Sequence, residues 1–279
     1  MTGTIKNNRS EMADTEKLVD YVLSRKNEDG GYTFCKPLPS KLPETYYAVY
    51  ILKSIGFEVP ERESLIKYLR NSFDFNVPSL YYVLNTLNLL GEGLPDMREF
   101  ILSRLELILK KPKNVWLKKG GITATYSFES PNPLRVIFML SSCLRLLKEE
   151  IPDYVMDFVR SHEKDGGYGN PSPNLRDTYY CLSVLGEGSK RNVEFILNHK
   201  SSPGFTKSPG GFPPYLEETF YALSSLKILG YNYKKNDIVD YISSLQNGNG
   251  GFRRSIFGGI STLENSFYAV SSLKILEVI

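Results

Sequence analysis

Acidic residues recur at the starts of apolar segments along the chain, where a carboxylate can do either of two things. They are Glu44, Asp177, Glu218 and Glu264. At a helix N-terminus, a carboxylate accepts hydrogen bonds from free backbone N–H groups and complements the helix dipole. If the segments are helices that run the same way, their N-termini meet at one rim, where several carboxylates could bind a metal ion or another cation. Both interpretations stay open.

Pairs of aromatic residues follow the starts of these apolar segments. The pairs are Tyr46-Tyr47, Tyr81-Tyr82, Tyr179-Tyr180, Phe220-Tyr221 and Phe267-Tyr268. Adjacent residues on a helix point about 100° apart, so one member of each pair can pack between helices while the other faces a shared axis. A ring of Tyr and Phe around that axis suits a long apolar ligand, and its π faces stabilise a cationic carbon. The alternative is that the rings only fill the core, which leaves open whether the centre is hollow.

Basic residues lie beside the same segments at Lys41, Arg135 and Arg176. Together they could bind a diphosphate, although a solvated side chain explains each one more simply. Over the whole chain, 34 basic and 31 acidic residues are mixed without a basic block. We therefore expect no nucleic-acid partner. No apolar run approaches the length of a membrane span, and the polar N-terminus lacks the apolar core of a signal peptide.

Cysteine and histidine are scarce, which bears on disulfides and metals. Cys35, Cys143 and Cys181 form no CxxC pair. A disulfide framework is therefore not expected, and a reducing, cytoplasmic setting fits best. His162 and His199 fall at the ends of predicted helices, so we interpret them as polar helix termini.

The segments that carry these residues are copies of one repeat. The clearest copies are 216–229 and 263–276, and the weakest runs from 136 to 147. One register position is occupied by Ala48, Val83, Leu140, Cys181, Ala222 and Ala269, at intervals of 35, 57, 41, 41 and 47 residues. The mean of about 44 residues is the size of a two-helix unit.

Each copy is apolar nearly all round, as a buried inner helix should be, and an amphipathic helix precedes it. Glycine pairs at 30–31, 120–121, 166–167, 210–211 and 250–251 predict tight reversals between the two helices, each followed by a residue that plugs the helix end. Gly56, Gly91, Gly186 and Gly230 follow the inner segments, where a helix ends in the left-handed conformation. The second repeat is short, and the third carries an insert at 111–133 that includes Trp116.

These repeats predict an all-α fold, an (α/α)6 toroid with six inner helices inside six outer ones. An open solenoid would need a polar end cap, but the last repeat is still apolar at Val278 and Ile279. Closure onto the first repeat buries that surface. We expect a disordered tail at 1–14 and a single toroid domain at 15–279.

Two motifs resemble those of a known family. Gln246 followed by Gly250, Gly251 and Phe252 is similar to the Q-x-x-x-G-x-W repeat of class II terpene cyclases, with Phe in place of Trp. The stretches 30–46 and 176–183 resemble the Gly-Gly … Lys-x-x-Asp-x-Cys region of protein prenyltransferases. Over residues 15–279 the chain therefore resembles the prenyltransferase and squalene-cyclase repeat family, with a layout nearest to prenyltransferase β-subunits.

The catalytic motifs of that family are incomplete in this chain. Protein prenyltransferases hold zinc with Asp, Cys and His, but Tyr179 stands where the Cys should follow Asp177, and Tyr46 follows Glu44 in the same way. We therefore expect no zinc site of that type, while Mg²⁺ bridging carboxylates to a diphosphate stays an option. No D-x-D-D motif is present, so the sequence does not support protonation-initiated cyclisation.

The preferred hypothesis is a toroid whose central cavity accepts an isoprenoid or lipid-like ligand. If it is an enzyme, the resemblance implies a prenyltransferase-like or cyclase-like reaction. Candidate catalytic residues are Asp177, Tyr179 and Glu218. Candidate ligand-binding residues are Lys41, Glu44, Tyr46, Tyr81, Arg176, Tyr180, Phe220, Tyr221, Phe267 and Tyr268. The alternative is an inert toroid that binds a protein, since the β-subunits pair with a helical α-subunit, and Trp116 would then be an anchor.

Overall fold

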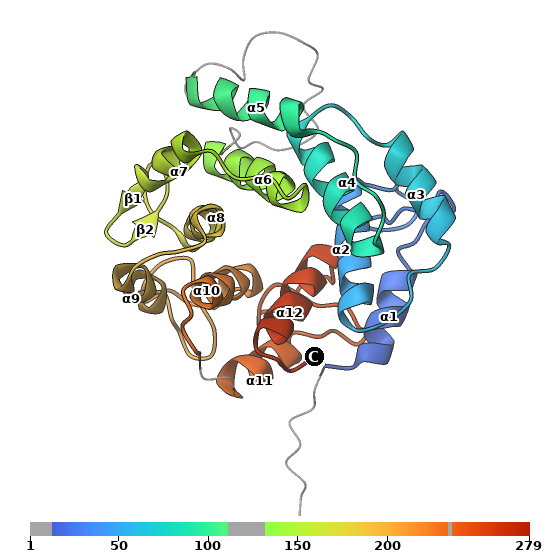
Figure 1. Ribbon diagram of the computed structural model, residues 1–279. Helices are drawn as coiled ribbons and strands as arrows, with labels where there is room; N and C mark the ends of the chain where they lie inside the picture. Colours follow the sequence, from blue (N-terminus) through green and yellow to red (C-terminus); the bar gives the residue numbers. More distant parts are fainter. Residues whose placement is uncertain (1–12, 111–131, 234–235) are drawn as a thin grey trace, which may run out of the picture.

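The computed structural model describes residues 13–110, 132–233 and 236–279, which form two concentric layers of helices (Figure 1). The outer layer holds α1 (Thr15–Leu23), α3 (Arg62–Asn71), α5 (Arg98–Lys110), α7 (Asp153–Arg160), α9 (Lys190–Asn198) and α11 (Asn236–Ser244). The inner layer holds α2 (Leu42–Ser54), α4 (Val77–Leu90), α6 (Pro133–Leu146), α8 (Leu175–Leu185), α10 (Leu216–Ile228) and α12 (Leu263–Ile275). A small hairpin, β1 (Glu163–Lys164) and β2 (Gly167–Tyr168), precedes α8.

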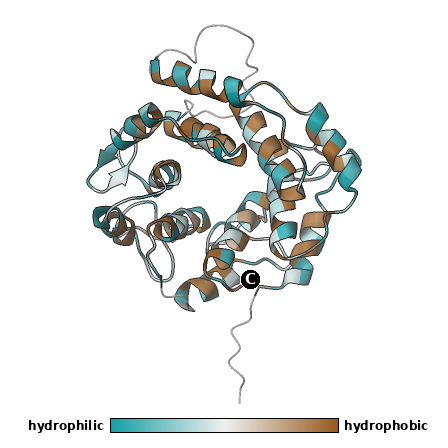
Figure 2. Ribbon diagram, in the orientation of Figure 1, coloured by the Kyte–Doolittle hydropathy of each residue, from teal (hydrophilic) through white to brown (hydrophobic). Residues whose placement is uncertain are grey.

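The inner helices form a closed ring. Each packs on the next in chain order, and α12 packs on α2 as closely as the other neighbours pack on each other (Figure 1). Equivalent residues of neighbouring inner helices meet at the same level, so the six helices run in parallel. The predicted all-α toroid is confirmed. Figure 2 shows many hydrophobic residues on the inner helices. The outer helices, such as α3 and α9, carry more hydrophilic residues.

The turn between outer and inner helix is built in one way in four repeats. Its central aromatic is at most 2% exposed, and the N–H of that aromatic donates to a hydroxyl of the following inner helix. The donor and acceptor pairs are Tyr32 and Thr45, Tyr168 and Thr178, Phe205 and Thr219, and Phe252 and Ser266, at 2.9–3.1 Å. In these four repeats the buried aromatic therefore fixes the start of the inner helix to the turn that precedes it.

The last repeat packs on the first through the same kind of turn contact that joins the first repeat to the second. A Cβ at Gly30 would clash with the backbone of α3, and one at Gly250 would clash with the backbone of α1. The last turn therefore packs on the first outer helix as the first turn packs on the second. Gln246 completes the closure, because its amide accepts from the N–H of Asp14 at 2.7 Å and donates to the carbonyl of Asp14 at 2.9 Å.

One predicted turn was misplaced. The sequence assigned the plugging aromatic of the fifth repeat to Phe212, after Gly210 and Gly211, but Phe212 is 65% exposed. The buried plug is Phe205, which follows a single glycine, Gly204. Glycine doublets mark tight turns in general, so they do not identify the one turn that packs against the helix.

Other predictions about chain organisation have mixed outcomes. Gly56, Gly91, Gly186 and Gly230 all have φ between 66° and 74° after an inner helix, as predicted. Most of the predicted tail at 1–14, most of the insert at 111–133 and Trp116 lie outside the described residues. None of the described helices has the length and apolar content that crossing a bilayer requires.

Candidate functional site

Six aromatic rings, one from each inner helix, encircle the axis of the toroid. They are Tyr46, Tyr81, Phe138, Tyr179, Phe220 and Phe267, here called the aromatic hexagon. Neighbouring ring centroids are 5.4–6.1 Å apart all the way round, which is the range of edge-to-face and tilted aromatic contacts. The rings therefore form a closed belt around the axis, and all six also line the pocket described below.

A second tier lies one residue further along each helix and carries hydroxyl groups. The Glu264 carboxylate accepts from Tyr268 at 3.1 Å and from Tyr47 at 3.4 Å. The hydroxyls of Tyr221 and Tyr268 are 3.1 Å apart, and those of Tyr47 and Tyr82 are 3.5 Å apart. One polar network thus runs over α10, α12, α2 and α4, with a single carboxylate at its centre.

A pocket of about 150 Å³ lies between these two tiers and the rim where the inner helices begin. Besides the aromatic side chains, its lining contains Met139, Arg135, Arg176 and Glu264. These three charged residues lie one helical turn before the second tier, so the pocket opens at the N-terminal rim of the inner helices. The two arginines come from α6 and α8, whereas Glu264 comes from α12 on the other side of the ring.

Burial keeps the tyrosines of the pocket neutral. It raises the pKa of Tyr179 to about 12, and it raises the pKa values of Tyr46, Tyr81 and Tyr180 as well. Neutral hydroxyls donate hydrogen bonds but do not act as bases near pH 7. The lining therefore offers π faces, hydroxyl donors, two guanidinium groups and one carboxylate.

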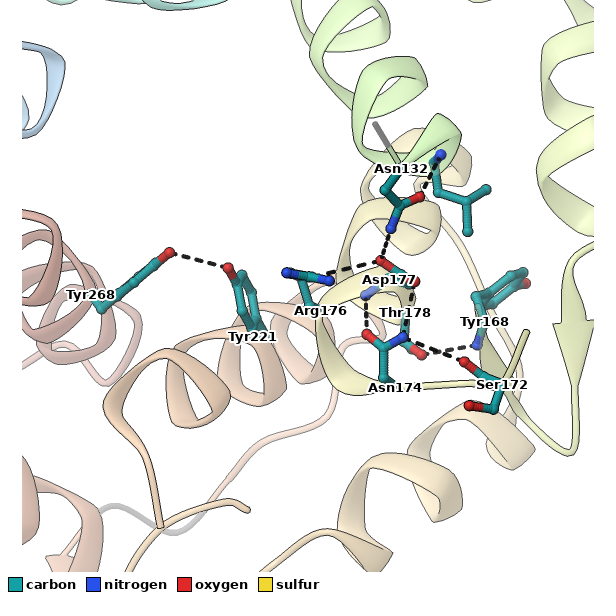
Figure 3. A network of polar contacts seen from close by, with 10 residues as sticks. Asn132, Tyr168, Ser172, Asn174, Arg176, Asp177, Thr178, Tyr221 and Tyr268 are labelled. Atoms are coloured by element: carbon teal, nitrogen blue, oxygen red, sulfur yellow. Dashed lines mark hydrogen bonds and ion pairs between the residues drawn. The ribbon is translucent and has the colours of Figure 1, made fainter. Parts of the chain in front are cut away.

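Asp177 belongs to the scaffold between α6 and α8 (Figure 3). Asp177 is only 2% exposed. Its carboxylate accepts hydrogen bonds from the side-chain amides of Asn132 at 2.7 Å and Asn174 at 2.9 Å. Asn174 also caps α8, because its side chain accepts from the N–H of Asp177. Arg176 lies 3.8 Å from the same carboxylate. Asp177 does not line the pocket, and its contacts match the helix-terminus interpretation of the recurrent acidic residues.

Glu218 occupies the corresponding position of α10 without such partners. Burial, and then the neighbouring charge of Glu217, raise its pKa to about 7, against an ordinary value of 4.5. At Glu44, in the same position of α2, burial raises the pKa too, and one carboxylate oxygen has no hydrogen-bond partner. Neither residue lines the pocket. The carboxyl group of Glu218, whose pKa is raised to about 7, therefore lies at the N-terminal rim of the inner helices but outside the pocket lining.

The pocket contains most of the residues predicted from sequence. Those that line it are Tyr46, Tyr81, Arg176, Tyr179, Tyr180, Phe220, Tyr221, Phe267 and Tyr268. Those that do not are Lys41, Glu44, Asp177 and Glu218. The predicted sets omitted Tyr47, Tyr82, Arg135, Phe138, Met139 and Glu264. The register could have supplied Phe138 and Met139, because they stand two and one residues before Leu140, as Tyr46 and Tyr47 stand before Ala48.

Histidines and carboxylates of the described residues form no metal centre. Nδ1 of His162 and Nδ1 of His199 each lie 2.9 Å from a carbonyl oxygen one turn earlier, at Phe158 and Phe195. This confirms them as helix termini. Within the described ranges, no three His, Cys, Asp or Glu side chains gather closely enough to hold a metal ion. The expectations about zinc and Mg²⁺ stay predictions.

Comparison with solved structures shows the same architecture in proteins of different activities. A protein geranylgeranyltransferase-I of Candida albicans complexed with GGPP is 16% identical, with a TM-score of 0.66 over 96% of this chain and 92% of that one. The type II terpene cyclase MstE from Scytonema is 14% identical, with a TM-score of 0.58 over 95% and 97%. A glycosidase variant is 9% identical, also at 0.58, over 99% and 100%. At these identities the likeness shows the fold and not the activity.

Sequence comparison gives the family. A search of curated proteins found no match. The family model described as "Prenyltransferase alpha-alpha toroid domain" matches residues 3–76 and 72–279, which together span nearly the whole chain. With the closed ring of six helix pairs, this match shows that the chain belongs to the prenyltransferase alpha-alpha toroid family.

Proposed function

We propose that this toroid binds a small isoprenoid-type diphosphate, with its apolar group in the axial pocket and its phosphates beside Arg135 and Arg176. The observation that carries the proposal is the lining itself, in which aromatic rings form the floor and two guanidinium groups stand at the opening. Arginine suits phosphate because its planar fork makes paired charge-assisted hydrogen bonds. Apolar rings beside two cations match a ligand with one greasy and one anionic end.

The size of the pocket limits the apolar group. A dry cavity of about 150 Å³ accommodates a molecule the size of benzene. A single five-carbon isoprene unit has that size, whereas a 20-carbon chain does not fit unless the aromatic hexagon opens. The similar structures that are complexed with GGPP or with geranylgeranyl dihydroxybenzoate are therefore guides to ligand class, and we infer a shorter ligand here.

The lining also suits chemistry on such a ligand. π faces and the Glu264 carboxylate would stabilise positive charge on an allylic carbon, while guanidinium groups would stabilise a departing diphosphate. In a prenyl transfer, Glu264 and the aromatic rings would face the allylic carbon, while the two arginines on the other side of the toroid would face the diphosphate.

A thermal-shift series tests the proposal. Dimethylallyl, geranyl, farnesyl and geranylgeranyl diphosphates are compared with inorganic pyrophosphate, with and without Mg²⁺. A ligand that binds only the folded state at 100 times its Kd stabilises by about 2.7 kcal/mol, or roughly 5 °C in a chain of this size. We expect the largest shift with dimethylallyl diphosphate and the smallest among the prenyl diphosphates with the 20-carbon chain.

The control variants separate the site from general charge effects. Arg135→Ala and Arg176→Ala should each reduce the shift, whereas Arg98→Ala, on the outer helix α5, should leave it unchanged. The proposal fails if no prenyl diphosphate shifts the melting temperature at saturation. It also fails if pyrophosphate alone gives the whole effect, because the aromatic pocket would then contribute nothing.

A further inference from the structure

Three loops on the rim that surrounds the pocket opening share a construction. Each runs from a buried aromatic to the start of an inner helix and is closed by a backbone hydrogen bond. The loops, here called the tip loops, are 33–40, 206–214 and 253–261, closed by the N–H groups of Lys41, Tyr215 and Thr262. The fourth repeat closes its loop, 169–173, by the same bond from Asn174 to Tyr168. It therefore serves as an internal reference that is three or four residues shorter.

Each tip loop ends in an ordered turn. The N–H of Leu38 donates to Cys35 at 2.9 Å, that of Gly211 to Ser208 at 3.0 Å, and that of Gly258 to Ser255 at 3.3 Å. In the third loop, Ser255 and Gly258 also pair as a bridge, so that Ile256 and Phe257 occupy the tip of a miniature hairpin. Hydrogen-bonded turns hold their side chains in place, so the exposure of these residues is a built feature.

The tip loops expose large apolar side chains. The residues are Phe34, Leu38, Phe212, Ile256, Phe257 and Ile260, with exposed fractions of 39–72%. They make up half of the strongly exposed large hydrophobic residues among those the structure describes. The reference loop 169–173 has no large apolar residue. Since exposed apolar area is unfavourable in water, its concentration in three loops marks an interaction surface.

The three loops are neighbours on the ring. Phe212 and Phe257 lie 5.7 Å apart between ring centroids, and the N–H of Leu216, which begins α10, donates to the carbonyl of Arg254. Because α12 packs on α10 and on α2, the loops before these helices occupy one sector of the rim. The loops therefore lie side by side on one part of the rim and present their apolar side chains on separate protruding turns.

The charged residues within the three tip loops are all basic. The tip loops contain Lys36, Lys207, Arg253 and Arg254 and no acidic residue. Arg254 pairs with Glu217, and the reference loop carries no charge at all. Apolar side chains that project beside basic ones, with no acidic residue among them, are the pattern that inserts into the boundary of an anionic bilayer.

We propose that the three tip loops dock this protein on an anionic lipid surface. An interface with a flat protein partner has a continuous apolar core. These apolar residues instead stand on separate turn tips, each of which can enter the lipid headgroup region. The pocket opens on the same rim, so docking brings its opening to the bilayer. The proposal stands on the loops alone and does not need the ligand proposed above.

Vesicle co-sedimentation of the full chain tests the proposal. Vesicles of phosphatidylcholine alone are compared with vesicles that contain 30% phosphatidylserine, at 0.1 M and 0.5 M NaCl. We expect the phosphatidylserine vesicles at low salt to bind at least tenfold more protein than neutral vesicles, with most of the binding lost at high salt. The triple variant Phe212→Ser, Phe257→Ser, Ile260→Ser should lose at least tenfold in binding.

The control is Phe57→Ser, which removes an exposed aromatic from the opposite rim, after α2. It should bind as the unaltered chain does, and circular dichroism should show unchanged folding for every variant. Failure to bind phosphatidylserine vesicles, or equal binding by the triple variant, would overturn the proposal. So would self-association in solution that depends on Phe257, because the surface would then be an interface with a second copy.

Discussion

The N-terminal ends of α8 and α10 occupy equivalent places in two repeats, yet their acidic residues have opposite fates. Asp177 on α8 is held by the amides of Asn132 and Asn174. Glu218 on α10 has Tyr215 as its N-cap, which makes no side-chain capping bond, and the pKa of Glu218 is raised to about 7. Two carboxyl groups at the same repeat position thus differ because two amides hold one of them, while burial and the charge of Glu217 raise the pKa of the other.

The largest effect should come from removing the satisfied carboxylate. Asp177→Ala removes the acceptor of the Asn132 amide and leaves the Asn174 amide with only the Ser172 carbonyl, at 3.4 Å. Hydrogen bonds to charged groups contribute about 1.5–3 kcal/mol each. We expect a loss of about 3 kcal/mol in the free energy of unfolding, measured by urea denaturation at pH 7. A loss below about 1 kcal/mol would show that the two ends differ less than their contacts indicate.

An intermediate and opposite effect is expected at Glu218. The folded-state pKa of Glu218, about 7, lies above its ordinary 4.5, so ionisation opposes folding. That cost is absent below pH 4.5, grows as the pH rises, and is complete above pH 7. Glu218→Gln should therefore match the unaltered chain at pH 4 and be more stable by about 2–3 kcal/mol at pH 8, since one pKa unit corresponds to about 1.4 kcal/mol.

Urea titrations of both chains at several pH values check this difference. Glu16→Gln, which removes a carboxylate from the exposed start of α1, is the control. Equal stability of the Glu218→Gln variant and the unaltered chain at pH 8 would contradict the contrast between the two helix ends.

The smallest effect should come from transferring the cap. Tyr215→Asn gives α10 the capping residue that α8 has, and such caps contribute about 1 kcal/mol. The loss of the stacking between Arg254 and the Tyr215 ring, 4.3 Å from centroid to guanidinium carbon, offsets part of that gain. The more sensitive readout is the pKa of Glu218, followed by carboxyl NMR, which should fall toward its ordinary value as the new amide donates to it. An unchanged pKa would mean that partners at the cap do not explain the difference.

The tiers of the axis differ in how well the sequence predicted them. The aromatic pairs, their recurrence and the family were all evident from sequence, and nine of the thirteen candidate site residues line the pocket. Phe138 was missed because the weakest copy of the repeat replaces one tyrosine pair with Phe138-Met139. Glu264 was considered as a helix cap or as one of several carboxylates that bind a cation, but not as a pocket residue, since its bonds to Tyr47 and Tyr268 join the last repeat to the first.

The sequence by itself determined the number of repeats and the two helical layers, because periodicity is a local property that a chain displays residue by residue. Ring closure was predicted correctly but for the wrong reason, since Ile279 stays 36% exposed and the ring is closed by the packing of α12 on α2 and by the bonds between Gln246 and Asp14. The tertiary structure alone decided that six aromatic rings form a closed belt around the axis, that Asp177 is held by two amides while burial raises the pKa of Glu218, and that Phe205 rather than Phe212 is the buried plug. These outcomes depend on which side chains from different repeats reach the same point. Contacts of that kind follow from packing in three dimensions, and sequence spacing does not encode them.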